Sequence, residues 1–263
     1  MRLILISLVA SLICSVAFAN DIYVTQTGTG NTLVLDIEQD GEDNTVNFSV
    51  GNHAENSVKI RQETDNSYIG YTTLWGSGLA WGGDLDGTDN TLDIRQWCNQ
   101  STCIRDDFQF HIYGDDNDVM FGQGYEIPGA NSTSFQTDSY EGGGHFVRLD
   151  IHGDDNSFKG SQRSQSSTSN HTNTTYIYGD DNTARTVQVH DGAKDLTLTL
   201  NGDDHTVYVE QRNAGAHNAT INLTNGTNPY SLSLSQNSAT AQNYSMTGTC
   251  NTSGGCSVSV TQQ

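Results

Sequence analysis

The chain has 263 residues, with 31 acidic and 11 basic side chains and a formal net charge of −20 at pH 7. This shortage of Lys and Arg argues against nucleic acid as a partner, because binding to phosphates needs clusters of basic residues. Only 34% of the residues are hydrophobic, so order has to come from a repeated pattern rather than from a large globular core.

The first nineteen residues predict a secretory signal peptide. Arg2 gives a positive start, an apolar run extends to Phe18, and Ala17-Phe18-Ala19 is a typical cleavage site. The run is too short to favour a membrane span, and no later stretch approaches the length of one. We therefore expect a mature chain, 20–263, that is secreted to the extracellular space or the cell surface and is not an integral membrane protein.

One sequence pattern occurs five times between Leu85 and Gln211. Each copy has an apolar residue, a turn sequence close to Gly-Asp-Asp-Asn, and then alternating apolar positions that lead to Gln. In the second copy, Ile112 to Asn117 reads Ile-Tyr-Gly-Asp-Asp-Asn, and Val119 and Phe121 precede Gln123. Weaker copies precede Leu85, and a late one follows Gln211.

The alternation in each copy is typical of a half-buried strand, because successive side chains of a strand point to opposite faces. Gly supplies positive φ, and Asp and Asn tolerate left-handed backbone, so Gly-Asp-Asp-Asn predicts a turn. One strand–turn–strand unit cannot bury its own apolar face. We therefore predict an all-β protein, a β-solenoid of stacked strand–turn–strand repeats with loop insertions. The pattern leaves open whether a coil has two or three faces.

Asn and Gln occupy inward positions at the strand ends. In a stack with coils about 4.8 Å apart, each amide side chain is expected to donate to one neighbour and to accept from the other. Such a ladder satisfies buried polar groups. The predicted amide ladder comprises Asn90, Gln96, Asn117, Gln123, Asn156, Gln162, Asn182, Gln188 and Gln211.

We expect one repeat domain, 20–263, with loop insertions near 63–84, 124–144 and 163–174. These stretches interrupt the repeat, and the third is almost wholly Ser, Thr and Asn. The first contains Trp75 and Trp81, which either recognise a ligand such as a sugar or cover part of the solenoid. Alternation weakens from Ala239 to Gln263, which suggests a cap.

Four cysteines follow the predicted cleavage site, namely Cys98, Cys103, Cys250 and Cys256. Export to an oxidising compartment favours disulfides, and we expect the local pairs Cys98–Cys103 and Cys250–Cys256. The alternative is a zinc site with four thiolates, although the spacings are looser than in typical zinc knuckles.

The acidic turns of stacked coils are expected to form a column on one edge. Carboxylates about 5 Å apart repel by roughly 1 kcal/mol in water, so such a column attracts cations, and Ca²⁺ accepts carboxylate oxygens in flexible geometry. The alternative is that Asp is present because turns favour it. The candidate calcium ligands are Asp115, Asp116, Asp154, Asp155, Asp180, Asp181, Asp203 and Asp204.

The sequence predicts no catalytic residues and no cofactor apart from this calcium. It contains no G-x-S-x-G, P-loop, dinucleotide-binding or H-E-x-x-H motif. Because some β-helix proteins cleave polysaccharides with acidic residues, a polysaccharide hydrolase or lyase remains an alternative. His205 stands where other copies have Asn, which indicates a structural substitution.

Two early segments, Gln26 to Asn31 and Gln39 to Asn44, resemble the Q-x-G-x-x-N turn of the curlin repeat. The six-residue step from Asn90 to Gln96, from Asn117 to Gln123 and in later copies is similar to the other half of that repeat. The resemblance covers most of the chain in pieces. It departs from the family in having Ile or Leu in place of the first Gln, long insertions and cysteines.

Curlins are the subunits of curli, the functional amyloid fibres of Gram-negative bacteria. The resemblance implies a divergent, pilus-like structural subunit that self-assembles head to tail into extracellular fibres for biofilm matrix or adhesion. Its implied partners are copies of itself, an outer-membrane secretion pore and a nucleator subunit. The end strands Ile22 to Gln26 and Val258 to Gln262 carry no charged side chain and look available for pairing. The alternative is a monomeric calcium-dependent surface adhesin or a glycan-binding β-solenoid.

Overall fold

A computed structural model describes residues 20–27, 33–39, 44–51, 56–62, 68–70, 83–85, 88, 90–96, 107–112, 114–122, 145–164, 170–224 and 228–263. Throughout these residues the secondary structure is strand and turn, without a helix. The predicted signal peptide, Trp75, Trp81, Cys98, Cys103 and Gln123 lie outside the described residues.

Two parallel sheets form the fold. The first sheet consists of β1 (Asp21–Thr27), β3 (Thr45–Gly51), β5 (Tyr68–Gly70), β6 (Gly83–Leu85), β8 (Asp107–Phe108), β9 (His111–Ile112), β11 (Phe146–Val147), β13 (His171–Thr172), β15 (Lys194–Leu196), β17 (His217–Asn222) and β19 (Gln242–Thr247). The second sheet consists of β2 (Leu33–Asp36), β4 (Asn56–Lys59), β7 (Thr91–Asp93), β10 (Asp118–Met120), β12 (Ser157–Arg163), β14 (Thr183–Val189), β16 (Thr206–Arg212), β18 (Tyr230–Asn237) and β20 (Cys256–Gln262).

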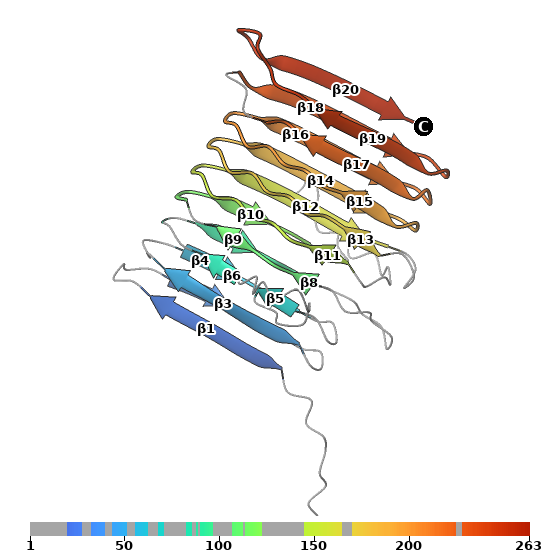
Figure 1. Ribbon diagram of the computed structural model, residues 1–263. Helices are drawn as coiled ribbons and strands as arrows, with labels where there is room; N and C mark the ends of the chain where they lie inside the picture. The colour runs from blue at the N-terminus through green and yellow to red at the C-terminus, as the bar shows by residue number, and fades with distance from the viewer. Residues whose placement is uncertain are drawn as a thin grey trace, which may run out of the picture.

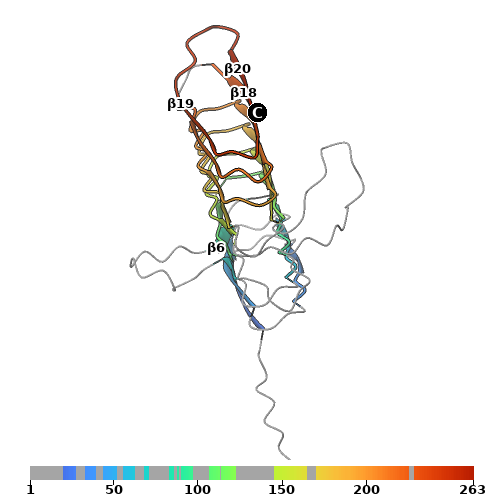
Figure 2. The ribbon, with the colours of Figure 1, turned by 90° about the vertical axis from the view of Figure 1, so that its right-hand side faces the viewer.

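The chain alternates between the two sheets, so each coil has two faces. Successive strands of one sheet pair in parallel and in register, as in the series β14, β16, β18 and β20 of the second sheet. Figure 1 shows the coils stacked from the N-terminal β1 to the C-terminal β20, and Figure 2 shows the sheets as two facing layers. The predicted β-solenoid is thereby confirmed, and the open question of two or three faces is answered.

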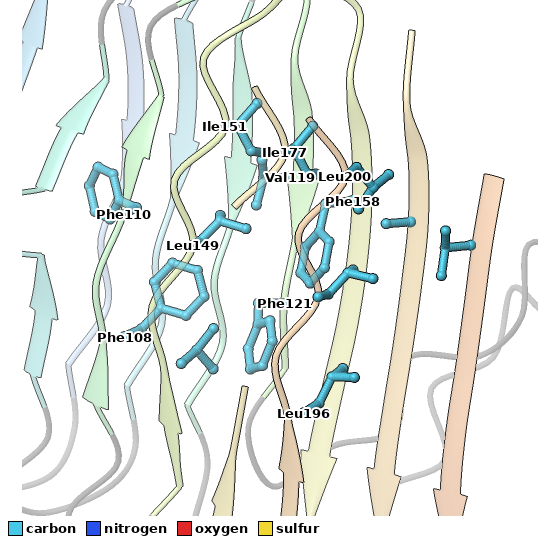
Figure 3. Close-up of a cluster of buried hydrophobic side chains, with 14 of the residues drawn as sticks. Phe108, Phe110, Val119, Phe121, Leu149, Ile151, Phe158, Ile177, Leu196 and Leu200 are labelled. Atoms are coloured by element: carbon cyan, nitrogen blue, oxygen red, sulfur yellow. The ribbon is translucent and has the colours of Figure 1, made fainter. Parts of the chain in front are cut away.

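Apolar side chains from both sheets fill the space between the layers. Because the strands are in register, equivalent inward residues stack into columns along the solenoid. One second-sheet column consists of Val58, Leu92, Val119, Phe158, Ala184, Val207 and Leu232, each at most 2% exposed. Across the layers, the rings of Phe108 and Phe121 approach to 5.1 Å between centroids (Figure 3). The core is therefore a narrow, continuous apolar band.

Two of the predicted loop insertions are partly wrong. Within 63–84, β5 and β6 pair with successive halves of β3, so both belong to the first sheet. Within 163–174, β13 pairs with β11 and β15, and His171 and Asn173 are buried, as is Thr175 directly after this segment. The Ser/Thr/Asn-rich composition suggested a loop, but two of its inward polar residues are hydrogen-bonded. Asn173 Nδ2 donates to Thr186 Oγ1 at 3.0 Å, and Thr175 Oγ1 donates to Asn173 Oδ1 at 2.9 Å. The whole of 124–144 lies outside the described residues.

The segment 239–263 is an ordinary coil rather than the expected cap. β19 pairs in register with β17, and β20 pairs in register with β18. The alternation looked weak because its inward residues include Tyr244 and Met246, while its outward residues are Ser, Thr and Asn. The solenoid therefore ends with the same backbone arrangement that it has in its middle.

Candidate functional site

The acidic turns stack on one edge of the solenoid, as the repeat predicts. The first Asp of each turn is held by its own side chain, because its carboxylate accepts a hydrogen bond from the preceding turn. The backbone N–H of Asp115 donates to Asp154 Oδ1 at 2.8 Å, and the N–H of Asp154 donates to Asp180 Oδ1 at 2.9 Å. The same bonds link Thr88 to Asp115 and Asp180 to Asp203. These four carboxylates thus join neighbouring coils.

The glycine of each turn allows this close stacking. A Cβ atom added at Gly179 would lie 2.3 Å from the carbonyl oxygen of Gly202, and one at Gly153 would lie equally close to that of Gly179. Since real Cβ contacts are far longer, the turn backbones can stack at this distance only with glycine. The repeat therefore requires Gly at this position for close approach. The expectation that Gly supplies the positive φ of the turn is wrong, because Gly153 and Gly179 lie outside that region.

The second Asp of each turn has left-handed backbone and an exposed side chain. The φ values are 53° for Asp116, 54° for Asp155, 55° for Asp181 and 60° for Asp204. In the middle of this column, partial desolvation and then the carboxylates of Asp155, Asp204, Asp180 and Asp203 raise the pKa of Asp181. The turns therefore hold like charges together, as the sequence predicted.

The calcium site stays a prediction. The structure brings its eight proposed ligands to one edge, but the first Asp of each turn already accepts a backbone N–H. Within the described ranges, no group of three or more His, Cys, Asp or Glu side chains is arranged to hold a metal ion. These hydrogen bonds support the alternative role for the first Asp, which is to complete the turn.

The inward Asn residues bond to backbone rather than to one another, which corrects the predicted Asn ladder. Asn156 Oδ1 accepts the N–H of Asn182 at 2.9 Å, while Asn156 Nδ2 donates to Gly179 O at 2.7 Å. Asn90, Asn117 and Asn182 accept in the same way. His205 continues the column, because its Nδ1 accepts the N–H of Tyr230 at 3.0 Å. His205 is therefore a structural substitution, as predicted, and it replaces Asn as the acceptor.

The inward Gln residues do form a side-chain ladder. Nε2 of each Gln donates to Oε1 of the next in the series Gln162, Gln188, Gln211, Gln236 and Gln262, at 2.7–2.9 Å. In the first coils, Gln96 donates to Gln62 and Gln62 donates to Gln39. The ladder therefore extends beyond the predicted residues to both ends of the solenoid.

A second polar column in the interior was missed by sequence reasoning. His145, His171, Lys194 and His217 stand at the start of successive first-sheet strands and are each at most 1% exposed. Counting back in steps of two from the inward residues Val147, Leu196 and Ala219 would have identified three of them. The repeat pattern used in the sequence analysis began at the acidic turn, so it did not include the opposite edge of the solenoid, where this column lies.

Cys250 and Cys256 form a disulfide, as expected from their spacing and from the predicted export. The bond closes the turn that leads from β19 into β20, in the last coil. It leaves neither sulfur as a thiolate, so these two residues are not zinc ligands and the four-thiolate alternative is wrong.

Both ends of the solenoid are open in the described part of the chain. β1 and β2 pair only toward the C-terminal side, and β19 and β20 pair only toward the N-terminal side. The inward apolar residues of these coils are only partly buried, among them Leu35 and Ile37 at one end and Val258 and Val260 at the other. Each end thus presents unpaired backbone groups around an apolar strip.

Comparisons with protein-family models, with curated proteins and with solved structures found no match to this chain. No helix among the described residues is long and apolar enough to cross a membrane. The functional argument therefore rests on the geometry of the columns and of the two open ends.

Proposed function

We propose that this protein is a structural subunit that stacks head to tail through its open end coils and so forms a fibre. The observation that carries this proposal is the continuity of the inward columns from one end to the other. With the last coil of one copy below the first coil of the next, β19 meets β1 and β20 meets β2, with all strands parallel. The end strands β1 and β20 lie in different sheets and do not meet each other.

The side chains at such a junction match those inside the solenoid. Continuing the observed register places Val258 on Leu35, Val260 on Ile37 and Gln262 on Gln39. In the first sheet, Tyr244 meets Ile22 and Met246 meets Val24. The apolar band therefore runs through the junction, and the glutamine ladder gains one more rung. Burial of these half-exposed residues supplies the driving force.

The charges of the two ends also favour this orientation. Residues 213–263 contain no Asp, Glu, Lys or Arg, whereas the first coil carries Asp21, Asp36 and Glu38 on its outer faces. Two N-terminal ends placed together would bring these carboxylates close to one another. Natural edge strands are commonly protected by charge, and the last coil lacks this protection.

The curlin resemblance adds a setting to this assembly. On that basis, we propose a secreted, non-enzymatic, curlin-like subunit whose extracellular fibres serve in biofilm matrix or adhesion. Export through an outer-membrane pore, nucleation by another subunit and calcium binding at the acidic turns belong to the same proposal. The stacked glutamine ladder and the parallel in-register strands are the features that support an amyloid-like fibre.

Electron microscopy of the purified protein and two matched variants tests the assembly. Val260→Glu places a carboxylate inside the proposed junction, while Ser259→Glu places one on the outer face of the same strand. We expect uniform thin fibres from the wild type and from Ser259→Glu, and none from Val260→Glu. Persistent wild-type monomers, with and without Ca²⁺, would overturn the proposal and favour the monomeric adhesin.

A cysteine pair tests the register of the junction. In the proposed stack, Ser245 of one copy lies beside Tyr23 of the next, and both side chains point outward. Chains with Ser245→Cys and Tyr23→Cys should form an intermolecular disulfide under mild oxidation. The control pair Thr247→Cys and Tyr23→Cys is two residues out of register, and equal cross-linking of both pairs would contradict the stacking.

A further inference from the structure

The column of His145, His171, Lys194 and His217 is an unusual interior for a protein. These residues stack one coil apart, at about 4.8 Å, on the edge opposite the acidic turns. The same column carries Asn20 and Asn44 in the first two coils and Gln242 in the last. Among the residues that the structure describes, the ionisable members of the column lie in the coils between residues 145 and 222.

Lys194 is solvated by backbone carbonyls rather than by a carboxylate. Its Nζ donates to the carbonyl oxygens of Asp191 at 2.7 Å, Gly192 at 2.8 Å and Gly215 at 3.3 Å. Burial lowers the pKa of Lys194 to about 8, while the negative charge of Asp191 acts in the opposite direction and raises it. The ammonium group therefore keeps its proton at neutral pH and places one positive charge in the middle of the column.

The imidazoles on either side are arranged for their neutral form. Nε2 of His171 lies 3.1 Å from the Arg163 carbonyl oxygen, and Nε2 of His217 lies 2.7 Å from that of Arg212, so in both rings Nε2–H is the donor. Nδ1 of His145 accepts the backbone N–H of His171 at 3.1 Å. Nδ1 of His171 and of His217 are buried and have no hydrogen-bond partner. A second proton would have to bind at Nδ1 of these rings. There it would face the N–H donor of His171 in the case of His145, and it would have no hydrogen-bond acceptor in the cases of His171 and His217.

Backbone carbonyls act on His171 and His217 in the direction that raises their pKa values, but within the described part of the chain no carboxylate acts on either ring to compensate an added positive charge. Lys194 lies between His171 and His217, and Arg163, His190 and Arg212 lie at the same edge. From the second sheet, the uncharged ladder of Gln162, Gln188, Gln211 and Gln236 faces the column, and Gln188 donates to Lys194 O. Asp191 acts on the Lys194 charge, while Asp195 points outward and accepts the Thr172 hydroxyl.

We propose that this column is an acid-sensitive latch, which keeps the coils from residue 145 to 222 closed at neutral pH and releases them when its histidines take up protons. The latch is a property of the single chain and does not require fibre formation. It would make the folded coils, and any assembly built from them, reversible by mild acid.

The direction in which pH changes the stability follows from the linkage between proton binding and folding. Burial, and then Lys194, lower the pKa of His171 from 6.5 to about 3, and burial chiefly lowers the pKa of His217. Because these folded pKa values lie below the unfolded value, protons bind preferentially to the unfolded chain. The stabilisation that comes from keeping these rings neutral is fully present above about pH 6.5, the pKa in the unfolded chain. Below this pH, each histidine lowers the folded-to-unfolded ratio about tenfold per pH unit, until the pH reaches the folded pKa.

The test compares the pH dependence of unfolding in matched histidine variants. The double variant His171→Asn with His217→Asn uses the residue that this column carries at Asn20 and Asn44, and His152→Asn removes an exposed histidine as a control. Thermal midpoints are measured by circular dichroism between pH 7.5 and 5, above the ordinary range of carboxylate titration. We expect the midpoint of the wild type and of His152→Asn to fall with pH, and that of the double variant to fall less steeply. Some slope remains in the double variant, because burial also lowers the pKa values of His190 and His205.

A wild-type midpoint that stays level or rises as the pH falls would overturn the latch, and so would a double variant with the wild-type slope. If the double variant does not fold, the wild type is titrated by NMR through the imidazole C–H signals. We then expect the His171 signal to remain that of the neutral ring down to pH 5. A folded-state titration near pH 6.5 would overturn the proposal, whatever the outcome of the fibre experiment.

Discussion

The coils before residue 213 and the coils after it have the same fold but opposite exteriors. All 31 acidic and 11 basic residues precede Asn213, and outward side chains pair between neighbouring coils, as Lys59 does with Asp36 and Lys159 with Asp118. After Asn213 the outward residues are Ser, Thr and Asn, as in the row Thr220 and Ser245. Both exteriors surround the same inward columns. The inward positions therefore determine the fold, while the outward positions are free to set charge and association.

The comparison also indicates how the protein avoids uncontrolled pairing. The excess of acidic outward residues repels other acidic surfaces. These residues lie in the coils before Asn213, which include the middle of the solenoid, where all strands already have neighbours. The uncharged region coincides with the open end formed by β19 and β20. Association is thus favoured at one end and opposed along the acidic part of the sides. Three sets of substitutions test these roles, and two of the sets compare an internal coil with the last coil.

The largest effect is expected at the stacked turns. In Gly179→Ala the new Cβ would lie 2.3 Å from Gly202 O, so neighbouring turns have to move apart, and we expect a loss of about 3 kcal/mol or more. The matched control is Gly254→Ala in the last turn, where nothing lies within 4 Å of the new atom. This control is expected to change the free energy of unfolding by less than about 0.5 kcal/mol. Equal losses in chemical denaturation would show that the turns do not depend on close stacking.

A medium effect is expected in the apolar columns. Val207 and Val258 occupy the same column, but Val207 is 1% exposed and Val258 is only partly buried at the open end. In the monomer, Val207→Ala should cost about 2–3 kcal/mol, because it leaves a cavity, and Val258→Ala less than about 1 kcal/mol. In fibres the difference between the costs of the two substitutions should become smaller, since stacking buries Val258. Chemical denaturation below and above the assembly concentration measures both values, and an unchanged difference would argue against burial at the junction.

The smallest effect is expected in the acidic column. Because the pKa of Asp181 is raised, its carboxylate opposes folding above that pKa, and stability increases as the pH falls through it. Asp181→Asn removes the charge and keeps a residue that tolerates φ of 55°. We expect a slightly higher thermal midpoint than the wild type at pH 7 and no difference near pH 3. A lower midpoint at pH 7 would mean that the carboxylate is stabilised there, as a bound cation would do.

Much of the second sheet was predictable from the sequence. In that sheet most inward residues are apolar and alternate with polar ones, and the inward series leads to Gln, as from Val207 and Val209 to Gln211. Because an acidic turn precedes β10, β12, β14 and β16, their register and the glutamine ladder follow from the repeat. The first sheet was less readable because the inward residues His171, Asn173 and Thr175 are polar and alternate with polar outward residues. In such a segment the inward and outward residues are equally polar, so hydrophobic periodicity does not reveal a strand.

The sequence by itself determined the all-β class, the stacked turns, the glutamine ladder and the pairing of Cys250 with Cys256, because each depends on residues that are close in the chain or on an exact repeat of spacing. The tertiary structure decided the two-stranded coil, the use of Asn side chains to hold backbone, and the assembly of His145, His171, Lys194 and His217 into one buried column. These residues are separated by more than twenty positions along the chain. Parallel, in-register stacking alone brings them together, and that register is set by the sum of all coils rather than by any one segment.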